Sequence, residues 1–364
     1  MRDAPGFRVV VTVLEGLSDG DHLEIAKRNG HYECSSYPTT PLSKTDGKIS
    51  FESAFEVVGS LPDGNQVEFA KHDDGLHSVG KASKLDLLMQ RVKDCRLCCE
   101  DTEILPKKRL INFIAERPNW PRYGGVPSIW TDWASRLDAK IVVIGKDWGP
   151  QSDVDKYRQQ YEQLSSLTGD KSKAWRRTIR SYTNNDDRSG QKLTEYLSES
   201  AKCVGLHLPP SFMDDVFVTN AVLCARQGNK YSDKDYFDEE KSTSNCCCTQ
   251  RFLQRQLEIV KPAVVVTLGK CRLWALGKMS KSKSLRRRIE EVHEAPPGYL
   301  RDDELGLSIV PVFHPAAYDD EESGRTNDKQ IEDYSYIWRA LGDSLHLSGK
   351  NLIRACFPNA VGSA

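Results

Sequence analysis

No part of this sequence is apolar for long enough to cross a membrane. A transmembrane helix needs roughly 18 or more consecutive apolar residues, and no run in the 364-residue chain approaches that length. The amino-terminal stretch, MRDAPG, lacks the apolar core of a secretory signal peptide. We therefore expect no membrane span and a location in the reducing cytoplasm.

The chain also lacks an excess of charge of either sign. Its 51 Lys and Arg residues balance 52 Asp and Glu residues, which gives a net charge of −1. This balance argues neither for nor against a nucleic-acid partner, because a local basic stripe is sufficient to bind phosphates. Two basic stretches occur, at 171–177 and 278–288, and each alone is typical of a solvated surface.

Cysteine, in contrast, is abundant, with 11 residues. Stable disulfides are rare in a reducing compartment, so we expect some of these thiols to bind a metal or a cluster. Cys95 and Cys98 have metal-type spacing, Cys224 follows a predicted strand, and a triplet at 246–248 precedes a predicted helix. Four thiolates from three segments can hold a [4Fe–4S] cluster or zinc. Three further cysteines are interpreted as ordinary buried residues: Cys203, Cys271 and Cys356.

The length of the chain predicts more than one domain, because single hydrophobic cores stop growing beyond about 250–300 residues. In residues 1–85, β-rich stretches alternate with turn clusters; the stretches are Arg8–Leu14, Ser50–Val58 and Gln66–Ala70. Short strands separated by turn signals are typical of a sandwich. We expect a small all-β sandwich-like domain here, a binding or accessory domain whose partner the sequence leaves open, with another protein as the candidate.

Residues 86–364 alternate between apolar runs and helical patterns. The runs that read as buried strands are Ile141–Ile144, Val216–Val222, Ala263–Gly269 and Ile309–Val312. Strands that alternate with helices predict a parallel α/β sheet. We expect an α/β domain with an open, four-stranded parallel sheet flanked by helices, and a polar, helix-rich insertion at 154–212.

Two polar motifs directly follow the first and last of these strands: GKDWG at 145–149 and FHPAA at 313–317. Open α/β sheets place their sites at the carboxyl ends of parallel strands. The carboxylate of Asp147 can orient and activate water, although capping a helix is at least as common at such a position. His314 precedes a proline, which favours an extended backbone. Its imidazole can donate to an oxygen that gains negative charge, but a lone histidine is more often structural.

The strand at 216–222 carries an amide, Asn220. An amide presents a donor and an acceptor side by side, which suits it to reading the edge of a base. The alternative role is to satisfy the backbone of the loop that follows. An acid, an imidazole and an amide are thus predicted at the ends of three strands of one sheet.

Together these motifs resemble those of the uracil-DNA glycosylase superfamily. GKDWG is similar to its first motif, GQDPY or GEAPG, and FHPAA is similar to its second, HPS or HPA. TNAVLC at 219–224 resembles the strand that carries the base-reading Asn. The spacing of the cysteines resembles that in the iron–sulfur branch of this superfamily. The helix and the strand expected at 252–269 are similar to the elements that follow the last cluster cysteine in that branch. The resemblance covers residues 90–345.

The resemblance implies a monofunctional DNA glycosylase, which flips a base out of the helix and hydrolyses its N-glycosidic bond. The base would be uracil or another deaminated or modified base. By the resemblance, Asp147 activates water, His314 hydrogen-bonds the departing base, and Asn220 reads the base edge. Further residues expected to bind substrate are Gly145, Trp148 and Pro315. The implied ligands of a [4Fe–4S] cluster, in preference to zinc, are Cys95, Cys98, Cys224 and Cys248. Expected phosphate contacts are Lys281, Lys283, Arg286 and Arg287.

Departures from the family pattern leave other functions open. Lys146 stands where the family has Gln or Glu, and its ammonium could tie up the adjacent carboxylate. That favours a protein that reads a modified base or nucleic acid without cutting it. The large insertion favours a glycosylase for a hypermodified base of the phage type. The triplet also leaves Cys246 or Cys247 open as the fourth cluster ligand.

Overall fold

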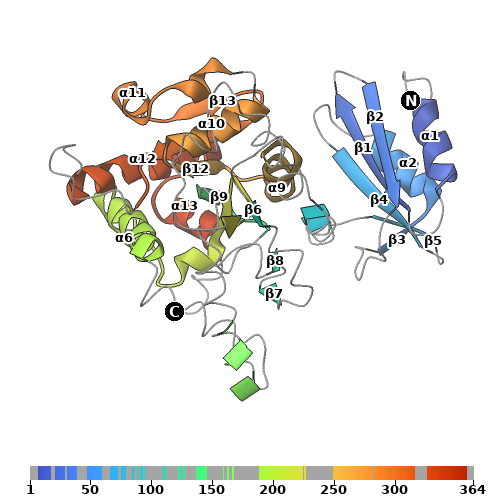
Figure 1. The fold of residues 1–364 in the computed structure, drawn as a ribbon. Coiled ribbons are helices and arrows are strands. Elements are labelled where there is room, and N and C mark those ends of the chain that lie inside the picture. Colours follow the sequence, from blue (N-terminus) through green and yellow to red (C-terminus); the bar gives the residue numbers. More distant parts are fainter. Residues whose placement is uncertain are drawn as a thin grey trace. The chain divides into compact units, whose positions relative to one another are not determined.

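The computed structural model divides the chain into two compact units, Met1–Gln90 and Arg91–Ala364 (Figure 1). The structure describes residues 7–17, 21–28, 31–38, 47–59, 66–72, 75–78, 84–85, 88, 91–92, 95, 110–111, 122–123, 126–127, 137–145, 159, 162–163, 166–167, 188–223, 225–226, 249–280, 282–315 and 326–358. In these residues, no helix combines the length and the apolar character that a bilayer span requires.

In its described residues, the first unit contains a five-stranded antiparallel sheet and the helices α1 and α2. Its strands lie in the order β2-β1-β4-β5-β3. The strands are β1 (Asp21–Arg28), β2 (His31–Pro38), β3 (Gly47–Ile49), β4 (Gln66–His72) and β5 (Gly75–Ser78), and the helices are α1 (Phe7–Glu15) and α2 (Phe51–Gly59). One core joins buried residues of both helices to Leu23, Ile25 and Phe69 of the sheet.

Two of the three strands predicted in this unit are helices, so the expected all-β sandwich is wrong. Arg8–Leu14 falls in α1 and Ser50–Val58 in α2, whereas the strand at Gln66–Ala70 is confirmed as part of β4. The fully buried residues recur one helical turn apart: Val10 and Leu14 in α1, Ala54 and Val58 in α2. The β-branched composition suggested strands, but this four-residue period packs one helical face on the sheet and decides the conformation.

The second unit is built on a five-stranded sheet in the order β10-β9-β12-β14-β13. Its strands are β9 (Ile141–Gly145), β10 (Val216–Asn220), β12 (Val264–Leu268), β13 (Leu300–Asp302) and β14 (Leu307–Val312). The first four in this order are parallel neighbours, which confirms the four predicted strands. The fifth, β13, is an antiparallel edge strand of three residues, too short to show an alternating pattern in the sequence.

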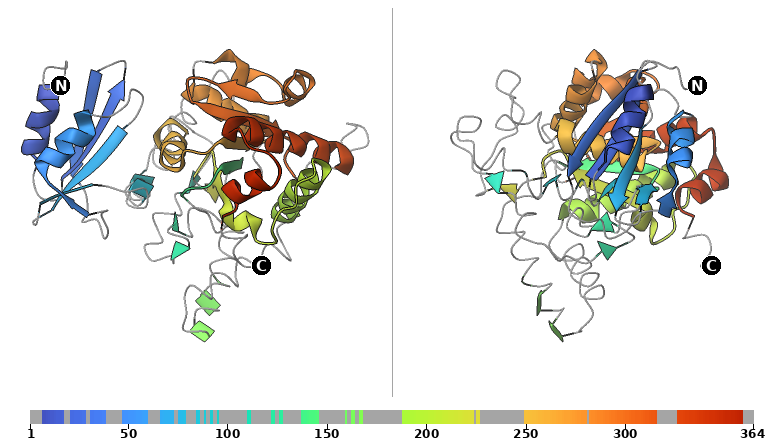
Figure 2. Two further views of the ribbon diagram at one scale, coloured as in Figure 1. Left: turned by 180° about the vertical axis from the view of Figure 1, so that it is seen from behind. Right: turned by 90° about the vertical axis from the view of Figure 1, so that its right-hand side faces the viewer.

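Helices cover the sheet, and one layer packs on the face formed by alternate strand residues. That layer contains α6 (Arg188–Cys203), α12 (Asn327–Leu345) and α13 (Gly349–Cys356). The helices α6 and α12 lie side by side (Figure 2). The structure also describes the helices α9 (Gln254–Val260), α10 (Lys270–Met279) and α11 (Ile289–Glu294), with short helical turns η1 (Phe212–Asp215), η2 (Thr249–Leu253) and η3 (Lys283–Arg286). Two small antiparallel pairs are β6 (Leu110–Ile111) with β11 (Ala225–Arg226) and β7 (Arg122–Tyr123) with β8 (Val126–Pro127).

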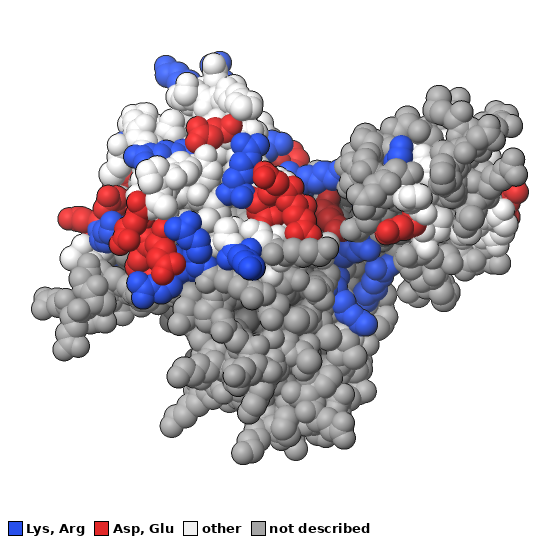
Figure 3. All heavy atoms as spheres, turned by 90° about the horizontal axis from the view of Figure 1, so that it is seen from above, with Lys and Arg blue, Asp and Glu red and all other residues white. Residues whose placement is uncertain are grey.

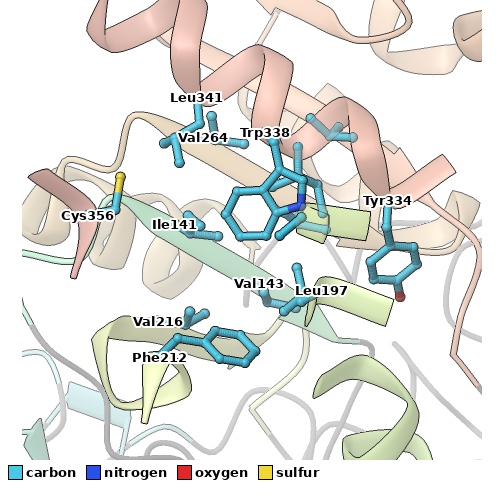
Figure 4. Packing of buried hydrophobic residues seen from close by; sticks show 14 of the residues in the cluster. Ile141, Val143, Leu197, Phe212, Val216, Val264, Tyr334, Trp338, Leu341 and Cys356 are labelled. Carbon is cyan, nitrogen blue, oxygen red and sulfur yellow. The ribbon is translucent and has the colours of Figure 1, made fainter. Parts of the chain in front are cut away.

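The core of the second unit shows that α6 belongs to the fold. Trp338 of α12 lies over Ile141 and Val143 of β9 (Figure 4). Its indole nitrogen donates to Ser200 Oγ of α6 at 2.9 Å. The sequence placed 188–203 in an insertion at 154–212, but this segment forms α6 in the connection between β9 and β10, and its buried residues are part of the core.

Candidate active site

The carboxyl ends of the four parallel strands meet at one edge of the sheet. Gly145, the last residue of β9, is in register with Asn220, the last residue of β10. The end of β12 is joined to β14 because the Gly269 amide donates to the Val312 carbonyl at 2.6 Å. His314 follows two residues beyond β14. The edge therefore presents an amide, a glycine and an imidazole in that order, as expected for a site in an open α/β sheet.

Asn220 and Gly145 approach each other closely at this edge. The amide oxygen of Asn220 occupies the space that a Cβ at residue 145 would need. The backbones are fixed as well, because the Ala221 amide donates to the Gly145 carbonyl at 2.9 Å. Both residues are partly exposed. A side chain at position 145 would thus displace the amide, so glycine here makes room for the predicted base-reading group.

The strand that carries Asn220 is anchored from its other face. Thr219 points away from Asn220 by strand alternation and donates to Gln256 Oε1 of α9 at 2.6 Å. Both side chains are buried, with Thr219 1% and Gln256 0% exposed. A buried hydrogen bond of this kind fixes position because either partner alone would be left unsatisfied. Gln256 was part of the sequence pattern, but nothing in the sequence gave it this role.

The histidine motif lies where the sequence analysis expected it. Phe313 and His314 directly follow β14 and are half-buried, and Pro315 is buried. Gly269, which pins the end of β14, has a φ of 91°. This conformation suits glycine far better than other residues, so the turn after β12 depends on it.

A family comparison fits this arrangement. The model of the uracil DNA glycosylase superfamily matches residues 133–342, which is more than half of the 364 residues. The chain belongs to this superfamily. It is also similar to a type-4 uracil-DNA glycosylase of Sulfurisphaera tokodaii, with 28% identity over 131 residues. That alignment covers 35% of this chain and 50% of the relative, so the chain spans half the length of that protein.

Several predicted site residues of this superfamily member fall outside the described residues. They are Asp147, Trp148, Cys98, Cys224 and Cys248. Their neighbours are described: β11 begins at residue 225 and pairs with β6, and η2 begins at residue 249. The carboxylate and the aromatic residue of the first motif therefore remain predictions.

The cysteines that the structure describes separate into different environments. Cys95 is partly exposed, and its amide donates to the Val92 carbonyl at 3.2 Å. Burial raises the pKa of the Cys356 thiol to about 12, which agrees with its interpretation as an ordinary buried residue. Cys203 is exposed at the end of α6, so its interpretation as buried is wrong. Within the described ranges, no three His, Cys, Asp or Glu side chains gather as metal ligands, and three of the four expected thiolates lie beyond those ranges.

The basic stretch at 278–288 does not begin at the site's edge. Helix α10 starts at the carboxyl end of β12, and its 10 residues extend about 15 Å away from it. Ser280 then donates to Asp302 Oδ2 at 2.8 Å, and Asp302 is in register with Leu307 at the start of β14. Lys and Arg are interspersed with Asp and Glu on the face drawn in Figure 3. Lys281 lies outside the described residues, and the phosphate contacts expected of Lys283, Arg286 and Arg287 remain predictions.

Proposed function

We propose that the protein is a monofunctional DNA glycosylase that removes uracil or another deaminated or modified base. One observation carries the proposal: a chain of the uracil DNA glycosylase superfamily has Asn220 against Gly145 and His314 at the same edge of its sheet. A base in duplex DNA is out of reach of such an edge, so the target nucleotide is flipped out of the stack.

The proposed reaction breaks the bond between the sugar C1′ and the base nitrogen. Asp147 orients a water molecule, accepts its proton as the water oxygen bonds to C1′, and balances the positive charge that develops on the sugar. The base leaves with the electron pair of the broken bond. His314 donates a hydrogen bond to the base oxygen on which negative charge gathers, an interaction that strengthens in the transition state.

Asn220 would provide selectivity. Its amide can donate to one group and accept from another on the Watson–Crick edge of the flipped base. A base with a mismatched pattern leaves buried polar groups unpaired, which costs more than a missing apolar contact. Gly145 and the Thr219–Gln256 hydrogen bond would hold this amide in place.

The donor set also fits an iron–sulfur cluster. The type-4 relative supports the iron–sulfur branch, and thiolates are the ligands that [4Fe–4S] clusters take. Cys95, Cys98, Cys224 and Cys248 would hold the cluster. When bound, it would brace the segments that carry these thiolates and would take no part in bond cleavage.

Cluster binding gives a first prediction. Protein prepared without oxygen should contain iron and acid-labile sulfide, and Cys95→Ser should lose most of both because one of four ligands is gone. Cys203→Ser, which changes an exposed cysteine at the end of α6, is the matched control and should keep both. Iron and sulfide analysis with the visible absorption spectrum measures the result. Equal loss in the two variants, or wild-type protein without iron, would contradict the cluster.

Base excision tests the function itself. Protein from a host that lacks its own uracil glycosylases is incubated with single- and double-stranded oligonucleotides that contain uracil, hypoxanthine, xanthine or hydroxymethyluracil. Alkali then cuts any abasic site. Scission with wild-type protein and none with the Asp147→Asn, His314→Ala double variant supports the proposal and identifies the base.

A second function is favoured by Lys146, which stands next to Asp147 in the sequence. An ammonium beside the carboxylate could hold it away from water, and the chain would then read a modified base without cutting. Binding of the same oligonucleotides without scission on any of them would replace the glycosylase with such a reader, or with a glycosylase for a hypermodified base outside the panel.

A further inference from the structure

The end of β14 lies beyond its edge-strand partner. In the part of the chain that the structure describes, β13 pairs with β14 only as far as Leu300 opposite Ile309. Pro311 comes next on that side, and proline has no N–H to offer a partner strand. On the opposite side, Gly269 pins Val312. The last residues of β14, which precede His314, therefore need another contact on the β13 side to hold them in place.

His293 of α11 provides that anchor. Its Nε2 lies 2.7 Å from the Pro311 carbonyl oxygen, where a donor on a continued β13 would have been. A carbonyl only accepts, so this ring nitrogen carries a proton and donates. The two contacts, from His293 on one side and Gly269 on the other, hold the strand that leads into His314.

The other ring nitrogen of His293 is also engaged. Nδ1 lies 3.0 Å from Asp333 Oδ1 of α12, and the two side chains are only 6% and 2% exposed. Tyr336 packs its ring against the imidazole with centroids 4.9 Å apart, and its hydroxyl donates to the His293 carbonyl at 3.4 Å. Lys329 Nζ lies 3.7 Å from the same carboxylate oxygen. The imidazole thus lies between α12 and β14, with Nε2 at the Pro311 carbonyl and Nδ1 beside the Asp333 carboxylate.

Stability alone does not account for this arrangement. A buried polar contact such as that between His293 and Asp333 is often no more stabilising than apolar residues of the same volume, whereas it fixes distances and directions. The pair acts on the carbonyl three residues before His314. We propose that His293 is a positioning residue, which sets the end of β14 and thereby places the His314 imidazole. The placement of the His314 imidazole by His293 does not depend on the proposed function. Only the expected effect on the reaction rate rests on that function.

Two variants of His293 distinguish the hydrogen bond to the Pro311 carbonyl from the general effects of replacing a buried imidazole. Gln at this position places its amide near the former Nε2 and can still donate to Pro311, whereas Asn reaches only the former Nδ1 position. Both remove the imidazole beside Asp333, so a loss of stability from that cause is common to both. We expect kcat of His293→Asn to be about tenfold below that of His293→Gln, with KM unchanged within about twofold, because misplaced catalytic groups slow the chemical step.

The kinetics are measured well below the unfolding midpoint of each variant, and His207→Gln, at an exposed histidine, is the control that should match wild type. A second measurement needs no activity. In ¹⁵N-histidine spectra, the ring signals of His314, assigned from His314→Ala, should shift in His293→Asn and stay close to wild type in His293→Gln.

The outcomes distinguish the two proposals. An active wild type with equal kcat in the Asn and Gln variants and unmoved His314 signals would overturn the positioning role and leave the glycosylase intact. An inactive wild type whose His314 signals follow the expected pattern would overturn the glycosylase and leave the positioning role intact.

Discussion

Replacing His314 by alanine is expected to lower kcat for base excision by about 10²–10³-fold, with KM changed much less. Removal of one donor to a developing negative charge typically has an effect of this size. The donor acts on charge that the departing base acquires only in the transition state, so ground-state binding of DNA should hardly change. The position supports this role, because His314 extends from β14 at the edge that also carries Asn220.

Single-turnover kinetics on the oligonucleotide identified by the substrate panel measure this effect, and filter binding measures DNA affinity. His207→Ala, at an exposed histidine, is the control and should retain wild-type kcat. His314→Gln should recover part of the lost rate, because its amide can still donate a hydrogen bond. A His314→Ala variant with wild-type kcat would remove this imidazole from the mechanism.

The α/β sheet could be predicted from the sequence because its strands are buried on both faces. Such strands appear as uninterrupted β-branched runs, and Ile141–Ile144 and Val264–Leu268 are of this kind. The same argument failed at Arg8–Leu14, where valines lie on a helix. A short β-branched run is compatible with either conformation, and only the sheet against which it packs decides between them.

The positions of two candidate site residues could be predicted, because each lies next to a strand that the sequence marks clearly. Asn220 and His314 are found at the ends of the strands that were expected to carry them. The supporting contacts could not be predicted. Thr219 and Gln256 are 37 residues apart, and His293 meets Asp333 from a different helix. Contacts of this kind depend on how helices pack on the sheet, which leaves no periodic trace in the sequence.

Gly145 shows the difference between a motif and its physical reason. The first motif begins with glycine, but the sequence alone does not indicate which neighbouring group needs the space that a side chain would fill. In the structure, the space beside its Cα is taken by the Asn220 amide oxygen. Its φ is not in the left-handed region, unlike that of Gly269, so conformational freedom does not explain the residue. The close approach of two strand ends explains it.

Replacing Gly145 by alanine is therefore expected to leave the protein folded but to lower kcat/KM for excision by about 100-fold. The new Cβ would collide with the end of the Asn220 side chain, which can rotate away at a cost of about 0.5–1.5 kcal/mol. Alanine itself fits the backbone at this position. Movement of a recognition group by about 1 Å can reduce the rate by this factor, so the effect on activity should greatly exceed the effect on stability.

A double-mutant cycle tests whether the loss passes through Asn220. Asn220→Ala alone should also lower kcat/KM by about 100-fold or more, because the base edge is then unread. If Gly145→Ala acts by displacing this amide, it has nothing left to displace in the Asn220→Ala background, and the double variant should lie within about threefold of Asn220→Ala. Two losses that multiply would show that Gly145 acts independently of the amide. Circular dichroism and thermal unfolding of all four proteins establish that each comparison is made between folded molecules, so the coupling measures how these two strand ends share one site.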